Sequence, residues 1–231
     1  MSDIIIEAVV FDLDGVITDT AHFHFLAWKE LAGEIGIEID EAFNERLKGV
    51  SRMDSLELIL QEGNRQDDFP TEVKEKMADK KNLHYCEFLK ELTPNDVLPG
   101  ILPLLAEIKA EGIPVGLASV SKNAGTVIRA LRLEEQFDYI VDAAKIKRSK
   151  PDPEIFLTAC KKLQANPEKS IGIEDAQAGV DAIKASGMFA VGVGSTLEKA
   201  DLKLHSTDQL QWSEIKAQYV KWNQEKGVPR V

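Results

Sequence analysis

Several features that mark whole classes of proteins are scarce or missing in this sequence. Its 231 residues include only two cysteines, Cys86 and Cys160, which lie far apart and form no CxxC or Cys/His pattern. A disulfide framework and a zinc site are therefore not expected, and a reducing compartment fits. No stretch approaches the roughly 20 apolar residues of a membrane-spanning helix. The short opening apolar run contains Glu7 and lacks a small-residue cleavage site, so we expect a cytoplasmic protein without a signal peptide.

Basic residues are also fewer than acidic ones. The chain has 28 Lys and Arg against 39 Asp and Glu, a formal net charge of -11. General affinity for nucleic acid or for an anionic membrane depends on an excess of Lys and Arg, so neither partner is expected. An anionic substrate must meet a local cluster of positive charge instead. No internal repeat is visible, and we expect a monomer with small-molecule partners.

What the sequence does have is a regular alternation of two patterns. Apolar runs rich in Val and Ile predict buried strands over 4–11, 113–118, 139–141, 170–173 and 189–193. Helical spacing of apolar residues lies between them, over 101–108, 127–131, 155–163 and 178–183. This order predicts an α/β fold with a parallel sheet covered on both faces. Aromatic and apolar residues at near-helical spacing from Trp212 to Trp222 predict a closing helix that packs on the core.

One interval breaks this rhythm. About 100 residues with only helical signals separate the first two strands, whereas a crossover needs about a dozen. The helical signals cover 23–35, 43–50, 56–60 and 73–92. We predict a helical cap domain at 18–94, inserted into a core made of 1–17 and 95–231. The two crossings, near 18–20 and 93–100, are expected to lie side by side as a hinge.

Polar and charged residues follow the predicted strands. In an open α/β sheet, ligands bind beyond the carboxyl ends of the strands, and these residues are Asp12, Asp14, Ser119, Ser121, Lys122, Lys150, Glu174 and Asp175. Two like charges 4 Å apart repel by about 4 kcal/mol at an effective dielectric near 20. A divalent cation relieves that repulsion, and Mg2+ prefers oxygen ligands while keeping positions for water and phosphate.

Each of these residues also has an ordinary explanation. A lone DxD occurs widely, and a serine at such a position commonly caps the next helix. Lys150 alone resembles a solvated loop lysine, and Glu174 with Asp175 would stabilise the N-terminus of the helix that follows. None of these explanations accounts for the occurrence of such residues after each of four successive strands of one sheet.

Four ordered motifs carry a family resemblance. FDLDG at 11–15, the serine of LASVSKN, the lysine of SKPDP and GIEDAQAG resemble, in that order, the motifs of the haloacid dehalogenase superfamily of phosphotransferases. The resemblance implies a Rossmann-like parallel core with a cap after the first strand. It implies that Asp12 attacks phosphorus, that Asp14 is the general acid and base, and that Ser119 and Lys150 bind the phosphoryl group. It further implies Mg2+ held by Asp12, Asp14, Glu174 and Asp175.

A finer resemblance concerns the cap. FDLDGVITDTAHFHFLAWK, LKGVSR at 47–52 and SKN at 121–123 are similar to the beta-phosphoglucomutase branch of the superfamily. It implies exchange between beta-glucose 1-phosphate and glucose 6-phosphate through a bisphosphate. The implied substrate contacts are Trp28, Lys48, Gly49, Val50, Arg52, Lys81, Ser121, Lys122 and Asn123. Thr20 and His24 would act at the hinge, although a plain helix histidine, a surface Arg52 and a solvated Lys81 are the ordinary alternatives.

Two other functions remain open. Many members of the superfamily are phosphatases, so a sugar phosphatase with the same nucleophile is the nearest alternative. A signalling receiver also combines acids, a hydroxyl and a lysine at strand ends. The acceptor on the first strand, the acid two positions later and the long helical insert all argue against a receiver.

Overall fold

The computed structural model describes residues 5–226. Its centre is a parallel sheet with the strand order β3-β2-β1-β4-β5-β6. The strands are β1 (Ala8–Phe11), β2 (Val115–Leu117), β3 (Tyr139–Ile140), β4 (Ser170–Glu174), β5 (Phe189–Val193) and β6 (Leu202–Leu204). The five expected strands and the predicted fold class are confirmed. The first strand is shorter than expected: it begins at Ala8, and Ile4 lies outside the described residues.

The strand β6 was not predicted. Its three residues, LKL, are half-buried or exposed, so they lack the continuous apolar run that identifies the inner strands. The strand forms because its backbone pairs with β5, where Gly192 lies opposite Lys203. Tertiary pairing, rather than local pattern, decides such an edge strand.

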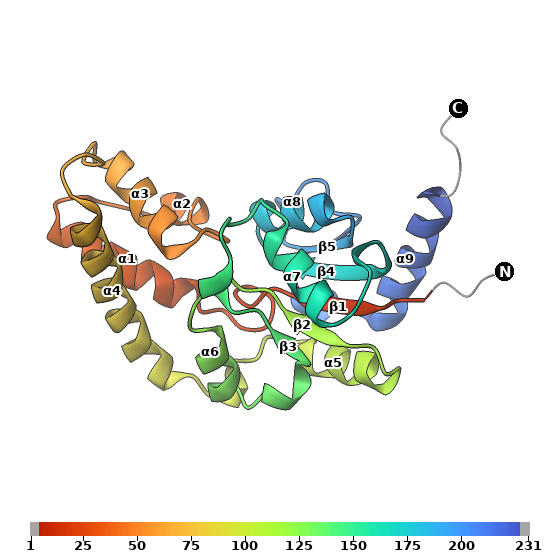
Figure 1. Ribbon diagram of the computed structural model, residues 1–231. Coiled ribbons are helices and arrows are strands. Elements are labelled where there is room, and N and C mark those ends of the chain that lie inside the picture. Colours follow the sequence, from red (N-terminus) through yellow and green to blue (C-terminus); the bar gives the residue numbers. More distant parts are fainter. Residues whose placement is uncertain (1–4, 227–231) are drawn as a thin grey trace.

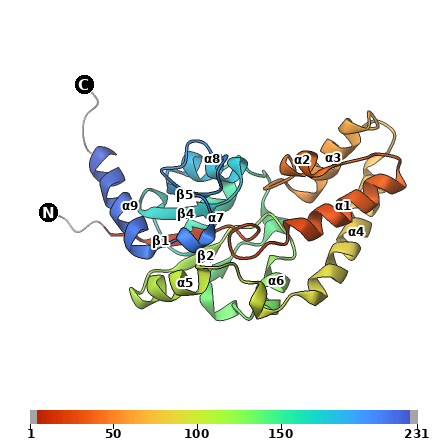
Figure 2. The same cartoon turned by 180° about the vertical axis from the view of Figure 1, so that it is seen from behind.

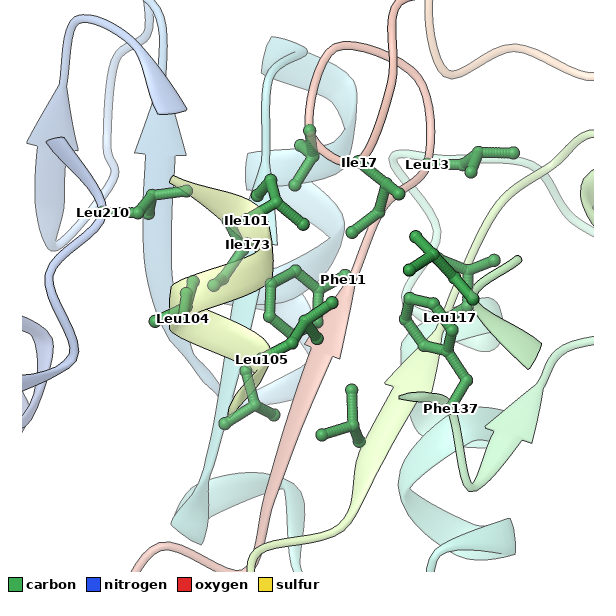
Figure 3. Packing of buried hydrophobic residues seen from close by; sticks show 14 of the residues in the cluster. Phe11, Leu13, Ile17, Ile101, Leu104, Leu105, Leu117, Phe137, Ile173 and Leu210 are labelled. Carbon is green, nitrogen blue, oxygen red and sulfur yellow. The ribbon is translucent and has the colours of Figure 1, made fainter. Parts of the chain in front are cut away.

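Side chains alternate across the sheet and build a core on each face. Val9 and Phe11 of β1 point to one side, where α5 (Ile101–Ala110), α6 (Ala124–Ala130) and α9 (Trp212–Lys226) supply apolar residues. Figure 3 shows this side, with Leu104 and Leu105 of α5 near Phe11. Val10 points to the other side, toward α7 (Glu154–Lys162) and α8 (Gln177–Ser186).

The closing helix is confirmed as α9. Trp212, Ile215 and Tyr219 are almost fully buried in the larger core, and Trp222 packs against it partly buried. These aromatic residues therefore stabilise the fold. Short 3-10 turns complete the described chain, at Leu89–Glu91, Pro94–Asp96, Glu134–Gln136, Ala143–Lys145, Pro167–Lys169 and Thr207–Gln209.

Between β1 and α5 the chain builds a separate helical lobe. It contains α1 (Ala21–Glu34), α2 (Glu41–Glu45), α3 (Arg52–Glu62) and α4 (Thr71–Phe88). The lobe has its own apolar cluster, which includes Trp28, Leu56 and Ile59. Both views place it at one end of the molecule, with α9 at the opposite end (Figures 1 and 2). We call this lobe the cap and the sheet with its covering helices the core.

The two crossings between core and cap touch each other, as expected for a hinge. Thr18 and Val97 form an antiparallel bridge, and the Leu98 backbone N–H donates to the Ile17 carbonyl at 2.9 Å. Thr18 Oγ1 also donates to the Asp96 carbonyl at 2.7 Å. The domain limits at 17/18 and 94/95 stay a prediction. Among residues 5–226, no helix combines the length and apolar character needed to span a bilayer.

Candidate active site

The site lies where the chain changes direction across the sheet. β1 pairs with β2 on one side and with β4 on the other, which is the switch point at which α/β sheets bind ligands. Backbone pairing continues past the strand ends: the Asp12 N–H donates to the Ile173 carbonyl at 2.9 Å, and the Ala118 N–H to the Phe11 carbonyl at 2.8 Å. The carboxyl ends carrying Asp12, Ser119 and Glu174 are thus brought together.

Gly15 shapes the loop that follows Asp12. It adopts a left-handed conformation with φ of +74°, and a Cβ there would lie 2.0 Å from Asp175 Oδ2. Glycine meets both requirements because it lacks a Cβ. The turn is closed by a hydrogen bond from the Gly15 N–H to the Thr18 carbonyl at 2.8 Å. The DLDG sequence therefore lets the first and fourth motifs pack against each other.

Lys150 lies between two acids rather than in solvent. Its Nζ is 2.6 Å from Asp12 Oδ1 and 2.7 Å from Glu174 Oε2, and all three residues are buried. Burial by itself would lower the pKa of Lys150, but the charges of Asp12 and Glu174 outweigh it and raise the pKa above its usual value. The side chain is therefore a fixed ammonium group in contact with the candidate nucleophile. The solvated-loop explanation for Lys150 is wrong.

Three carboxylates converge on one point. Oxygen atoms of Asp12, Glu174 and Asp175 lie within 4.8 Å of one another. Burial and the charge of Asp12 raise the pKa of Glu174 to about 7. Burial, followed by the charge of Glu174, raises the pKa of Asp175 well above its usual value. Such a crowded oxygen-only set suits a hard divalent cation, which would favour the ionised forms.

Glu174 also interacts with the N-terminus of the helix that follows it, which was its ordinary explanation. Its Oε1 accepts a hydrogen bond from the Ala176 N–H, at the start of α8, at 3.2 Å. Gly179 makes room for the carboxylate, because a Cβ there would lie 2.0 Å from Glu174 Oε2. Oε1 thus accepts from the backbone at the start of α8, and Oε2 lies between Gly179 and Lys150.

Asp14 is set apart from the acid cluster by its environment. Burial, with the charge of Asp12 second, raises the pKa of Asp14 to about 7, while a hydrogen bond from Thr20 opposes the shift. Thr20 Oγ1 donates to Asp14 Oδ1 and is itself 3.1 Å from the Tyr85 hydroxyl. A carboxyl that titrates near neutrality is suited to both donating and accepting a proton.

Lys81 is buried in the cap. The ordinary alternative for this residue, a solvated lysine, is wrong, because Lys81 is only 2% exposed. Its Nζ lies 2.5 Å from His24 Nδ1 and 4.7 Å from the centre of the Trp28 ring. Burial and the neighbouring charge of Arg52 lower the pKa of Lys81 to about 7. Burial and the charge of Lys81 likewise lower the pKa of His24 well below its usual value.

Core and cap enclose a cleft of about 490 Å³. On its core side lie Asp12, Asp14, Ser119, Ser121, the exposed Lys122 and Asp175, and on its cap side His24, Trp28, Lys48, Gly49, Val50, Arg52 and Lys81. Lys48 Nζ reaches across to within 3.9 Å of Asp175 Oδ2. The cleft therefore gathers most of the predicted site residues from segments far apart in the chain.

The core loop after β2 is held by its own serines. The Ser121 N–H donates to Ser119 Oγ at 3.1 Å, and the Asn123 N–H donates to Ser121 Oγ at 3.3 Å. Neither serine caps α6, whose N-cap residue is Asn123. The serine hydroxyls thus fix the loop at the edge of the cleft.

Two residues of α4 were missed by sequence reasoning. Tyr85 is fully buried, contacts Thr20 and stacks on His24 with ring centres 3.9 Å apart. Asn82 contacts both Arg52 and Asn123. The only signal was spacing, since Tyr85 follows Lys81 by four positions and shares its helix face.

Comparisons with known proteins agree with this arrangement. Residues 6–187 match the family model described as haloacid dehalogenase-like hydrolase. A protein of Bacillus subtilis named beta-phosphoglucomutase is 45% identical over 96% of this chain and 100% of its own length. A Thermotoga maritima protein named phosphorylated carbohydrates phosphatase is 33% identical over 79% of this chain and 82% of its own length.

A solved structure gives the same result. The crystal structure of beta-phosphoglucomutase from Clostridium difficile is 51% identical, has a TM-score of 0.93, and is matched over 94% of this chain and 99% of that one. The family model covers well over half of the chain, and the Bacillus and Clostridium proteins match it almost end to end. The chain belongs to the haloacid dehalogenase-like hydrolase family.

Proposed function

We propose that this chain is a magnesium-dependent beta-phosphoglucomutase. It would interconvert beta-glucose 1-phosphate and beta-glucose 6-phosphate through an aspartyl phosphate and a bound beta-glucose 1,6-bisphosphate. Two observations support this reading: the identities of 45% and 51% to proteins of that name, and a cleft with basic residues on both of its sides. The single observation that carries the chemistry is the contact of Lys150 with Asp12 at 2.6 Å.

Asp12 is the proposed nucleophile. Its carboxylate oxygen would attack phosphorus as the bond to the leaving sugar oxygen breaks, which gives an aspartyl phosphate. Lys150 contacts this carboxylate and supplies a fixed positive charge beside it. Ser119, at the end of β2 and buried, would donate a hydrogen bond to a phosphoryl oxygen.

Asp14 is the proposed general acid and base. It would protonate the leaving sugar oxygen and later accept a proton from the hydroxyl that attacks the aspartyl phosphate. Its pKa of about 7 allows both roles near neutral pH. Thr20 and His24 would position it, because Thr20 donates to the Asp14 carboxylate and His24 stacks on the tyrosine beside Thr20.

Mg2+ is the proposed cofactor, and the donor set fits it. Carboxylates of Asp12, Glu174 and Asp175, with the backbone carbonyl of Asp14, would hold the ion. When bound, it would supply positive charge to the phosphoryl oxygens and offset repulsion among the acids.

The cap would decide which acceptor reaches the phosphoenzyme. Arg52 with the loop at Lys48, Gly49 and Val50 would hold one phosphate of the bisphosphate, because a guanidinium group binds phosphate through two hydrogen bonds. Ser121, Lys122 and Asn123 would approach it from the core. A closed cap excludes water and favours the sugar hydroxyl, which separates a mutase from a hydrolase.

Phosphorus NMR tests the reaction directly. The protein is mixed with beta-glucose 1-phosphate, Mg2+ and a trace of the bisphosphate. We expect glucose 6-phosphate to accumulate with little inorganic phosphate. Release of inorganic phosphate without glucose 6-phosphate would instead support a sugar phosphatase, the activity named for the 33% identical Thermotoga relative. Rapid quenching and mass spectrometry should find a phosphorylated peptide containing Asp12.

The remaining expectations concern partners and location. The formal charge of -11 argues against nucleic acid or an anionic membrane as a partner, and the basic residues lining the cleft support small sugar phosphates. A monomeric state and a cytoplasmic location stay predictions. Gel filtration with light scattering measures the first, and fractionation of producing cells measures the second.

A further inference from the structure

Asn82 links the cap to the core through a single oxygen atom. It lies on α4 of the cap, and its Oδ1 is 2.8 Å from a guanidinium nitrogen of Arg52 on α3. The same Oδ1 is 2.7 Å from Nδ2 of Asn123, which belongs to the core loop after β2. One acceptor therefore ties a cap donor to a core donor.

Chemistry fixes the orientation of both amides. A guanidinium group can only donate, so the Asn82 atom that faces Arg52 must be its oxygen. The Asn123 atom facing that oxygen must then be the amide nitrogen. The thiol of Cys86, one helical turn after Asn82, lies 3.8 Å from Asn123 Oδ1 and donates to it. Both ends of the Asn123 side chain are thus held by the same face of α4.

The surroundings make Arg52 dependent on this contact. Its side chain is 17% exposed, and burial lowers the pKa of Arg52 from its usual value. Its carboxylate partner Asp79 lies 3.7 Å away with a side chain that is 80% exposed, so this long contact holds the guanidinium group only weakly. The short bond to Asn82 is therefore the stronger restraint on where the guanidinium points.

We propose that Asn82 is a positioning residue that assembles the second phosphate site. It holds Arg52 of the cap and Asn123 of the core in one place, so that both can face the phosphate group that is not being transferred. This inference rests on the proposed function, because the proposed mutase reaction runs through a bisphosphate and so needs a second phosphate site. Asn82 acts through its neighbours and is not itself proposed to transfer a proton or a phosphoryl group.

Two phosphoryl donors separate this role from a general effect on the fold. Beta-glucose 1,6-bisphosphate has a second phosphate, whereas acetyl phosphate has only the one that is transferred to Asp12. Hydrogen bonds to charged groups stabilise more than those between neutral groups. Loss of the shared acceptor should therefore weaken use of the bisphosphate about tenfold. In Asn82→Leu, we therefore expect KM for the bisphosphate to rise about tenfold, with phosphorylation of Asp12 by acetyl phosphate within twofold of the unchanged protein.

A second variant and a control complete the experiment. Asn82→Asp keeps an acceptor but places a negative charge near the phosphate, so KM should rise at least as much as in Asn82→Leu. Leu83→Ala changes the next residue of α4, whose side chain is exposed, and should leave KM unchanged. The inference is wrong if KM stays within twofold in both Asn82 variants, or if acetyl phosphate labelling falls as far as bisphosphate use. If the unchanged protein has no mutase activity, the proposed function itself has failed.

Discussion

The ammonium group of Lys150 lies 2.6 Å from the carboxylate of Asp12, although 138 positions separate the two residues in the chain. The same ammonium is 2.7 Å from Glu174, so one buried cation balances two buried acids. This arrangement explains how the sheet tolerates a buried carboxylate, that of the proposed nucleophile, at the end of its central strand. It also makes the stability of the protein depend on one lysine.

Replacement of Lys150 by methionine should destabilise the protein. The change leaves Asp12 and Glu174 buried without their cation, and removing one partner of a buried pair costs about 3–5 kcal/mol. Urea unfolding at pH 7.5 in the presence of a chelator measures the free energy of unfolding. Lys145→Met is the matched control, because the Lys145 side chain is 82% exposed, and it should change stability by less than about 0.5 kcal/mol. Equal effects of the two variants would contradict the role given to Lys150.

Asp175→Asn should weaken the binding of Mg2+ at least tenfold. Asp175 is one of three acids whose oxygens lie within 4.8 Å of one another, and an amide lacks the negative charge that attracts the ion. Isothermal titration calorimetry measures the affinity. Glu198→Gln removes an exposed acid from the loop after β5 and should bind Mg2+ like the unchanged protein. Unaltered binding by Asp175→Asn would place the metal elsewhere.

Because Lys81 is buried, the free energy of unfolding should rise with pH in the alkaline range. Burial, with the charge of Arg52 second, lowers its pKa in the folded protein to about 7, whereas in the unfolded chain it stays near 10.5. Between these values the unfolded state binds more protons, so stability rises with pH. Below pH 7 the destabilising effect is complete and the dependence from this group ends.

Lys81→Met removes that titration. The difference in unfolding free energy between the unchanged protein and Lys81→Met should shift in favour of the unchanged protein by up to about 1.4 kcal/mol per pH unit above pH 7. Chemical denaturation at pH 7.5, 8.5 and 9.5 measures it. Lys80→Met is the control, because Lys80 is the preceding residue and its side chain is 50% exposed. A constant difference across this range would show that Lys81 keeps an ordinary pKa.

Asp14→Asn should lower kcat with sugar phosphates about 10²- to 10⁴-fold, because the amide cannot carry the proton to the leaving oxygen. Acetyl phosphate has a better leaving group, so its reaction with Asp12 should be reduced much less. Stopped assays with both donors measure the two effects. Asp19→Asn removes an exposed acid from the same loop and should retain activity within about threefold. Normal turnover of sugar phosphate by Asp14→Asn would remove the acid and base role.

The residues directly after each strand were predictable because parallel strands bring their carboxyl ends to one edge. Asp12, Ser119 and Glu174 could therefore be placed together before any coordinates were known. The long gap between the first two strands likewise predicted a helical lobe, but it did not predict the contacts that Lys81, Asn82 and Tyr85 of α4 make. A helix pattern reveals one apolar face but not which partner that face meets.

The sequence alone determined the parallel sheet, the order of the four motifs and the interruption by the cap, because these depend on local spacing and on the chirality of the chain. Only the tertiary structure decided the environments of single side chains. It buried Lys81 against His24, paired Lys150 with two acids and set Asn82 between Arg52 and Asn123. Those outcomes depend on how the cap packs against the core, and pKa values and hydrogen bonds follow from that packing rather than from neighbours in the chain.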